Sequence, residues 1–208
     1  MADRGRPRSF DKDAALARAM DVFWLKGYEG TSMADLTAAM GIASPSLYAA
    51  FGGKEELFRQ ALDYYAKHEG ELIWGAALRA ETAYETVETF LMQTARAFTR
   101  RSRPSGCLVV LSALHPGEHS ETVRKELVEH RAQSVKDLRE RLRQGVARGE
   151  ISPAADLDAI AKYYVTVQQG MSIQARDGAT RQQLELIARA ALAAWRPLTA
   201  PEEIAAAR

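Results

Sequence analysis

Residues 31–57 have the sequence TSMADLTAAMGIASPSLYAAFGGKEEL, which is the pattern of two short helices joined by a tight turn. Ser32 is predicted to cap the first helix and Gly41 to end it. The second helix is expected to have Ser44 as its N-cap and Pro45 as its first helical residue, where the missing N–H costs nothing. This arrangement is a helix-turn-helix, whose second helix enters the major groove of DNA by its N-terminus.

Apolar residues keep helical spacing on both helices. Leu36 and Met40 share one face of the first helix, and Leu47 and Phe51 supply the buried side of the second. These side chains are expected to form the core of a small helical unit and to read no bases. The hydroxyl of Thr37 is expected to bond back along its own helix.

These residues resemble the DNA-binding domain of the tetracycline-repressor (TetR) family of transcriptional regulators. The resemblance runs from about Ser9 to Tyr65, and it includes the helix that precedes the motif and ends at Gly27. Its most specific part is the run Leu47-Tyr48-x-x-Phe51 followed by Lys54-Glu55-Glu56-Leu57. It implies a homodimer that acts on a palindromic DNA operator.

The resemblance also implies a set of DNA contacts. Helix N-termini and short hydroxyls donate well to phosphate oxygens. The residues that the resemblance assigns to phosphate are Thr31, Ser32, Ser44, Tyr48 and Lys54. Base reading would fall to Pro45 and Ser46. Because Ala49 and Ala50 leave the recognition surface poor in hydrogen-bond donors, specificity for the operator would depend partly on DNA shape.

The N-terminal run Arg4-Gly5-Arg6-Pro7-Arg8 is similar to the core of an AT-hook. Proline keeps such a segment extended, and a narrow A·T minor groove concentrates the negative potential that attracts arginine. We therefore expect Arg4, Arg6 and Arg8 to contact the minor groove. The alternative is a basic tail with non-specific affinity only.

Composition is consistent with a globular regulator. The chain has 208 residues, 47% hydrophobic residues and a formal net charge of +1, so DNA affinity must come from locally placed groups. No segment resembles a signal peptide or a membrane span, and we expect a cytoplasmic protein without a membrane partner. The single cysteine excludes an intramolecular disulfide.

Helical periodicity continues to the end of the chain, so the predicted fold class is all-α: a three-helix DNA-binding domain followed by a larger helical domain. We predict a basic arm at 1–8, the DNA-binding domain at 9–65, an effector and dimerisation domain at 66–200, and a tail at 201–208. The helices expected beyond the motif cover 54–78, 82–101, 106–114, 120–149, 156–176 and 180–195.

The last two of these helices are predicted to form a four-helix dimer interface, because the final helix is rich in alanine and small residues permit close approach. A single recognition helix also contacts too few base pairs for useful specificity. The alternative is ordinary core within one chain. The predicted interface residues are Leu157, Tyr164, Met171, Leu184, Ala188, Ala191 and Trp195.

By the resemblance, the middle helices enclose a pocket for a small-molecule effector of unknown identity. Plain core packing is the alternative for each candidate, because pockets and cores use the same residues. The candidate lining residues are Tyr65, Trp74, Phe98, Cys107, Leu111, Leu114, Tyr164 and Gln168. No cofactor and no metal site are predicted.

Cys107 supports a second hypothesis, a thiol-based sensor of electrophiles or oxidants on the same scaffold. It follows Gly106 at the expected start of a helix, and Arg100, Arg101 and Arg103 are near in sequence. A helix N-terminus and nearby cations lower a thiol pKa. The alternative is a buried cysteine that packs as a small hydrophobic residue.

His115-Pro-Gly-Glu118-His119 matches a metalloprotease pattern, H-x-x-E-H. That chemistry needs both histidines on one helical face, and Pro116-Gly117 breaks the helix between them. The chain is therefore not predicted to be an enzyme. It is predicted to be a homodimeric, ligand-responsive transcriptional regulator, and a repressor rather than an activator. A helical enzyme or small-molecule carrier without DNA binding is the remote alternative.

Overall fold

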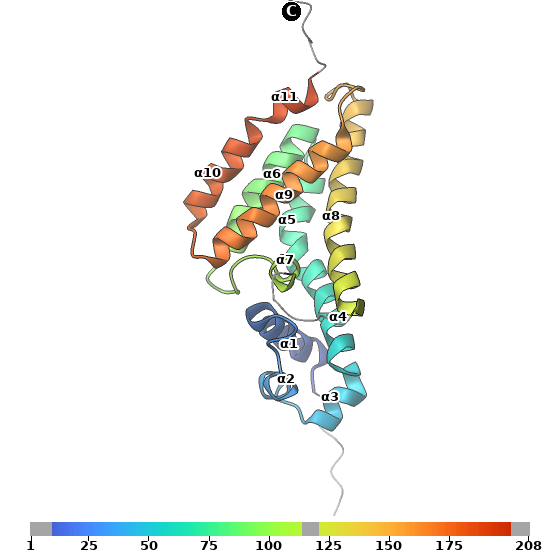
Figure 1. The fold of residues 1–208 in the computed structure, drawn as a ribbon, viewed down its shortest axis with the longest axis vertical. Coiled ribbons are helices and arrows are strands. Elements are labelled where there is room, and N and C mark those ends of the chain that lie inside the picture. Colours follow the sequence, from blue (N-terminus) through green and yellow to red (C-terminus); the bar gives the residue numbers. More distant parts are fainter. Residues whose placement is uncertain (1–9, 114–120, 201–208) are drawn as a thin grey trace, which may run out of the picture.

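The computed structural model describes residues 10–113 and 121–200, and in these ranges the chain consists of helices and loops without a strand. Figure 1 shows the short N-terminal helices at one end of an elongated molecule and the longer helices at the other. The all-α prediction is confirmed. The elements are α1 (Lys12–Lys26), α2 (Met33–Met40), α3 (Ser44–Phe51), α4 (Lys54–Tyr65), the π-helical turn η1 (Ala66–Gly70), α5 (Glu71–Leu78), α6 (Ala83–Phe98), α7 (Leu108–Ser112), α8 (Glu121–Ala147), α9 (Leu157–Arg176), α10 (Arg181–Leu192) and α11 (Trp195–Thr199).

Helices α1 to α4 pack around buried aromatic side chains. The rings of Phe23 on α1 and Phe58 on α4 meet edge to face, with centroids 5.0 Å apart. Leu36 from α2 and Leu47 from α3 are fully buried in the same cluster. An aromatic pair of this kind adds about 0.5–1.5 kcal/mol beyond area burial. The packing holds the two helices of the motif on the frame made by α1 and α4.

The ends of α2 are set by local groups, as predicted. Ser32 Oγ accepts a hydrogen bond from the Asp35 N–H at 3.1 Å, and the Asp35 carboxylate accepts one from the Ser32 N–H at 2.9 Å. Gly41 ends the helix at a φ of 70°, where a residue without a Cβ meets no steric penalty. The Thr37 hydroxyl donates to the Met33 carbonyl at 3.0 Å, which confirms the expected back-bonding.

The predicted start of α3 is wrong by one residue. Ala43 is the N-cap, Ser44 is the first helical residue, and no side chain caps the helix. Because the first four N–H groups of a helix lack an intrahelical partner, Pro45 is tolerated at the second helical position as well as at the first. Ser44 is consequently not used as a cap, and its side chain remains exposed.

The single helix predicted for residues 54–78 is divided by the π-helical turn. Helix α4 ends at Tyr65, η1 follows directly, and α5 begins at Glu71. Gly70, one of two expected weak points, closes the turn, whereas Gly75 lies inside α5. π-Helical turns are rare and occur often at functional sites. The turn falls where we predicted the boundary between the two domains.

The larger domain is a bundle in which α5 packs on α6, and α9 lies between α8 and α10. Capping boxes start α6 at Thr82 and α10 at Thr180, the second as predicted. Helix α6 ends at Phe98, before the expected Arg101. Helix α10 ends at Leu192 and not at Trp195, which instead begins α11.

The two parts of the chain meet at α1, α4, α7 and α8. The rings of Trp24 on α1 and Tyr65 on α4 are edge to face, with centroids 4.9 Å apart. Arg176, the last residue of α9, donates from Nη2 to the Trp24 carbonyl at 2.7 Å. The end of α9 is therefore tied directly to the first helix of the DNA-binding part.

Candidate nucleic-acid interface and ligand cavity

Helix α3 presents an exposed face at its N-terminal half. Leu47 and Phe51 are buried, and they fix the rotation of this short helix on α2 and α4. The exposed residues of its first turns are Ser44, Pro45, Ser46, Tyr48 and Ala49. Because no side chain caps α3, its first N–H groups are available to an anion such as a phosphate. This face fits the expected recognition surface.

The N-terminus of α2 is less available than predicted. Thr31 is buried, and its hydroxyl donates inward to the Gly27 carbonyl at 2.6 Å. Its side chain is therefore removed from the candidate phosphate contacts. Ser32 is exposed, but its hydroxyl bonds to the Asp35 carboxylate at 2.7 Å. Lys26, a cation that the sequence reading missed, pairs with Asp35 at 2.6 Å, and hydrogen bonds from Lys26 and Ser32 lower the pKa of Asp35.

Lys54 is the first residue of α4, next to the end of the recognition helix. Its Nζ lies 4.3 Å from the centroid of the Tyr28 ring, a cation–π contact that holds the side chain against the domain. Partial burial lowers the pKa of Lys54. The predicted contacts of Arg4, Arg6 and Arg8 lie outside the described residues.

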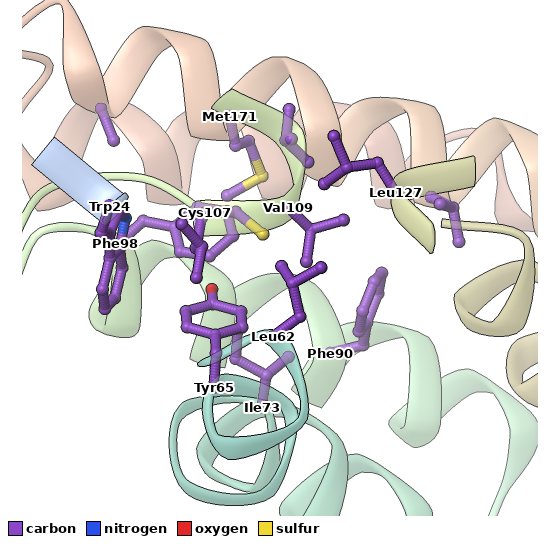
Figure 2. Packing of buried hydrophobic residues seen from close by; sticks show 14 of the residues in the cluster. Trp24, Leu62, Tyr65, Ile73, Phe90, Phe98, Cys107, Val109, Leu127 and Met171 are labelled. Atoms are coloured by element: carbon purple, nitrogen blue, oxygen red, sulfur yellow. The ribbon is translucent and has the colours of Figure 1, made fainter. Parts of the chain in front are cut away.

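A cavity of about 270 Å³ lies in the larger domain, between the π-helical turn, α5, α7, α8 and α9. Its apolar wall includes Ile73, Trp74, Val109 and Val110. In Figure 2 the hydroxyl of Tyr65 points from α4 toward Cys107. A concave, largely apolar site with a few polar groups is the usual form of a small-molecule pocket.

The cavity includes only some of the predicted lining residues. Of the candidates, Tyr65, Trp74, Cys107 and Gln168 line this cavity. Phe98, Leu111 and Tyr164 are buried and do not line it, so the alternative of plain core packing holds for these three. Leu114 lies outside the described residues.

Helix α8 supplies a polar wall that the sequence reading missed. Its lining residues are His130, Arg131, Gln133, Ser134 and Asp137. On a helix this rich in charge, the polar residues that face the cavity cannot be distinguished in the sequence from those that face solvent. Their spacing over two turns is the one signal that could have indicated a shared face.

The expectation of a lowered pKa for Cys107 is wrong. Burial raises the pKa of this thiol, against smaller opposing effects from a hydrogen bond with Tyr65 and from Arg131. The arginines that were expected to act on it point elsewhere: Arg100 and Arg103 bind Glu69, and Arg101 is exposed. The cysteine therefore has the character of a small buried hydrophobic residue.

This shift predicts a slow and alkaline reaction of Cys107 with iodoacetamide. Only the thiolate is nucleophilic, and a raised pKa reduces its fraction in the folded protein at every pH below that pKa. We expect slower alkylation in the folded than in the urea-unfolded chain at about pH 8, with the folded rate still rising where the unfolded rate levels off. Mass spectrometry reads the single cysteine directly. A folded rate equal to or above the unfolded rate would establish a reactive thiol.

An ion-pair network connects the wall of the cavity to the DNA-binding part. Glu69, in the π-helical turn, is buried and pairs with Arg100 and, at 3.0 Å, with Arg103. Arg103 also pairs with Asp21 of α1 at 3.0 Å. Ala66 and Gly70, in the same turn as Glu69, line the cavity. The π-helical turn thus contributes both to the lining of the cavity and to the ion pairs that extend to α1.

The predicted interface residues lie mostly inside the chain. Tyr164, Met171, Leu184, Ala188 and Ala191 are buried, so these five cannot form a surface for a partner, and the alternative of intrachain core holds for them. Leu157 and Trp195 are half-buried. The large apolar residues that α9 and α10 leave exposed are Tyr163, Ile173, Leu186 and Ile187.

No helix within 10–113 and 121–200 combines the length and apolar character needed to span a membrane. In the same ranges no group of histidine, cysteine and acidic side chains is arranged to hold a metal ion. His115 and His119 fall outside them.

Both parts of the chain match known families. Residues 15–61 match "Bacterial regulatory proteins, tetR family", and residues 83–191 match "Tetracyclin repressor-like, C-terminal domain". The chain is 39% identical over 197 residues to the HTH-type transcriptional repressor ComR of Escherichia coli (strain K12), which covers 92% of each chain. It is 31% identical over 182 residues to the HTH-type transcriptional repressor BdcR of the same strain, which covers 86% of each.

A solved structure has the same architecture. It is a cysteine mutant of the TetR family transcriptional regulator CifR complexed with 26bp double-strand operator DNA. The two chains are 47% identical with a TM-score of 0.88, and the match covers 91% of this chain and 100% of that one. The helix-turn-helix geometry and these relatives agree: the chain belongs to the TetR family of transcriptional regulators and is a DNA-binding regulator.

Proposed function

We propose that the protein is a homodimeric repressor that binds a palindromic operator in the cytoplasm and releases or tightens its hold when a small molecule occupies the cavity. The observation that carries the proposal is the continuous path from the cavity wall through Glu69 and Arg103 to Asp21 on α1. The relatives named as repressors, and the similar chain bound to operator DNA, support the DNA half of it.

On DNA, the N-terminal half of α3 would lie in the major groove. Ser44, Tyr48 and Lys54 would hold phosphates, and Pro45 and Ser46 would face base edges. Ser32 would add a contact through the start of α2, weakened by the neighbouring Asp35. Arg4, Arg6 and Arg8 would extend the contacts into the adjacent minor groove.

The dimer would form through the outer faces of α9 and α10. These two helices carry four of the ten large apolar residues that are exposed among the described residues. Leu186, Ala190 and Ala193 of the α10 segment are spaced so that they share one helical face, and all three are exposed. A symmetric pair of such faces would bring four helices together and set the separation of the two α3 helices.

A reversible ligand is favoured over thiol chemistry. Cys107 does line the cavity, but burial raises its pKa and no described cation other than Arg131 acts on it. The alkylation rates described above decide between the two mechanisms.

The first test concerns the DNA contacts. Lys54→Ala should weaken binding to all DNA sequences about equally and lower the slope of log affinity against log salt by roughly one. Ser46→Ala should change sequence preference without changing that slope, because a neutral hydroxyl releases no counterion. Fluorescence anisotropy at several salt concentrations measures both. Lys136→Ala, on the exposed side of α8, is the matched control; an unchanged slope for Lys54→Ala would remove that residue from the interface.

A further inference from the structure

Arg131 of α8 stands out among the residues that line the cavity. Its Nη1 is buried and donates no hydrogen bond to any described residue. Within residues 10–113 and 121–200, no carboxylate forms an ion pair with it. A guanidinium is always protonated, and a buried charged donor without an acceptor is costly. Arg131 is therefore a partly buried cation in the cavity wall that has no acidic partner among the described residues.

The acidic residues of the cavity do not fill this role. Asp137 accepts a hydrogen bond from Gln133 Nε2 at 2.7 Å. Glu71 pairs with Arg79, at 3.6 Å. Burial lowers the pKa of Arg131, and among the described residues only Cys107 counteracts this effect. A thiol with a raised pKa is a weak acceptor, so it does not satisfy the guanidinium.

The remaining wall fits an apolar body of small size. Ile73 and Trp74 come from α5 and Val110 from α7, whereas the polar residues of the wall come from α8. The volume of about 270 Å³ is below the range of roughly 300–1,000 Å³ that is usual for drug-sized ligands. The occupant must therefore be compact, with one end that accepts hydrogen bonds and one apolar end.

We propose that this cavity binds a small organic acid, whose carboxylate pairs with the guanidinium of Arg131 and whose apolar body packs on Ile73, Trp74 and Val110. Arginine and carboxylate form two parallel hydrogen bonds, which gives both affinity and orientation. The inference deepens the proposed function, because it names the chemical class of the effector.

The test uses the full chain and two matched pairs of probes: benzoate with benzamide, and hexanoate with hexanamide. Each amide has nearly the shape of its acid without the negative charge. Isothermal titration calorimetry should show millimolar or tighter binding of at least one acid and weaker binding of its amide. Arg131→Gln should weaken binding of that acid at least about tenfold, as expected for a lost charge-assisted hydrogen bond. Arg131→Lys keeps the positive charge but cannot form two parallel hydrogen bonds, so its affinity for the acid should lie between those of the wild type and Arg131→Gln.

Arg139→Gln is the matched control. Arg139 lies on the same helix, pairs with Asp158 at 3.0 Å and does not line the cavity, so its replacement should leave binding unchanged. Circular dichroism checks that each variant is folded. The proposal is overturned if neither acid binds the wild-type protein, if acid and amide bind equally, or if Arg131→Gln binds the acid as tightly as wild type.

Operator binding separates this inference from the proposed function. If an acid binds through Arg131 in calorimetry but does not change operator affinity, the proposed acid site is supported and the proposed ligand response is contradicted. If the neutral amides change operator affinity as much as the acids do, the proposed ligand response is supported and the proposed role of Arg131 is contradicted. Both readings use the same protein samples.

Discussion

Leu186→Arg should convert the protein to a monomer and reduce operator binding to near its non-specific level. Leu186 is 60% exposed on α10, in the face proposed for the partner. In a symmetric dimer each copy would bury a charge without a counter-charge, which is strongly unfavourable. With one recognition helix in place of two, the expected loss of specific operator binding is on the order of 4 kcal/mol or more. Sedimentation velocity and an operator-binding assay measure the two halves of the prediction.

The control for this variant is Leu78→Arg. Leu78 is 49% exposed at the end of α5, away from α9 and α10, so the same change should leave both the dimer and operator binding intact. A dimeric Leu186→Arg protein that binds its operator normally would place the interface on another surface. Ala188 and Ala191, which the sequence analysis placed in the dimer interface, are unsuitable for this experiment because a charge there would disrupt the core of a single chain.

Glu69→Gln should loosen the junction between the two parts of the chain. Glu69 is buried between Arg100 and Arg103, and its removal leaves two partly buried cations with one remaining carboxylate, Asp21. Breaking a fully buried pair costs about 3–5 kcal/mol, and since the arginines here are partly exposed we expect about 2–3 kcal/mol. In calorimetry this corresponds to a fall in Tm of roughly 4–12 °C for a chain of this size.

The same variant should bind its operator less tightly without any effector, because one of the contacts that orient α1 on the larger domain is weakened while the Arg176–Trp24 hydrogen bond remains. Glu140→Gln is the matched control: Glu140 pairs with Arg143 at 2.7 Å, but both side chains are exposed. Exposed pairs of this kind contribute about 0–1 kcal/mol, so its Tm and operator affinity should stay close to wild type. If the two variants behave alike, the network has no special role at the junction.

Local signals in the sequence were sufficient for much of the fold. Ser32, Gly41 and Thr180 act at short range, so their effects on helix ends can be predicted without knowledge of the tertiary structure. The start of α3 was missed because proline is compatible with more than one helical position. The inward hydroxyl of Thr31 could not be predicted, since it depends on how Gly27 places its carbonyl.

The sites were harder to predict than the helices. The most apolar stripe of α9 and α10 was assigned to a partner, but a helix buries its most apolar face in its own domain first, and Tyr164 and Leu184 are accordingly in the core. The polar wall of the cavity was missed because Arg131 and Cys107 meet at one cavity only through the packing of α8 against α7. Aromatic residues such as Tyr65 and Trp74 were found because they suit both a core and a pocket.

The π-helical turn also has a consequence for helical phase. Successive residues of an α-helix are rotated by about 100° around its axis. Two residues four apart therefore differ in direction by about 40°. Tyr65, Glu69 and Ile73 are four apart and nevertheless all buried, because the wider turn between Tyr65 and Glu71 absorbs part of this difference. Deleting one residue from the turn would restore a regular helix and rotate α5 against α4. Local helix propensity would be unchanged, yet Ile73 and Trp74 would face away from the cavity that they now line.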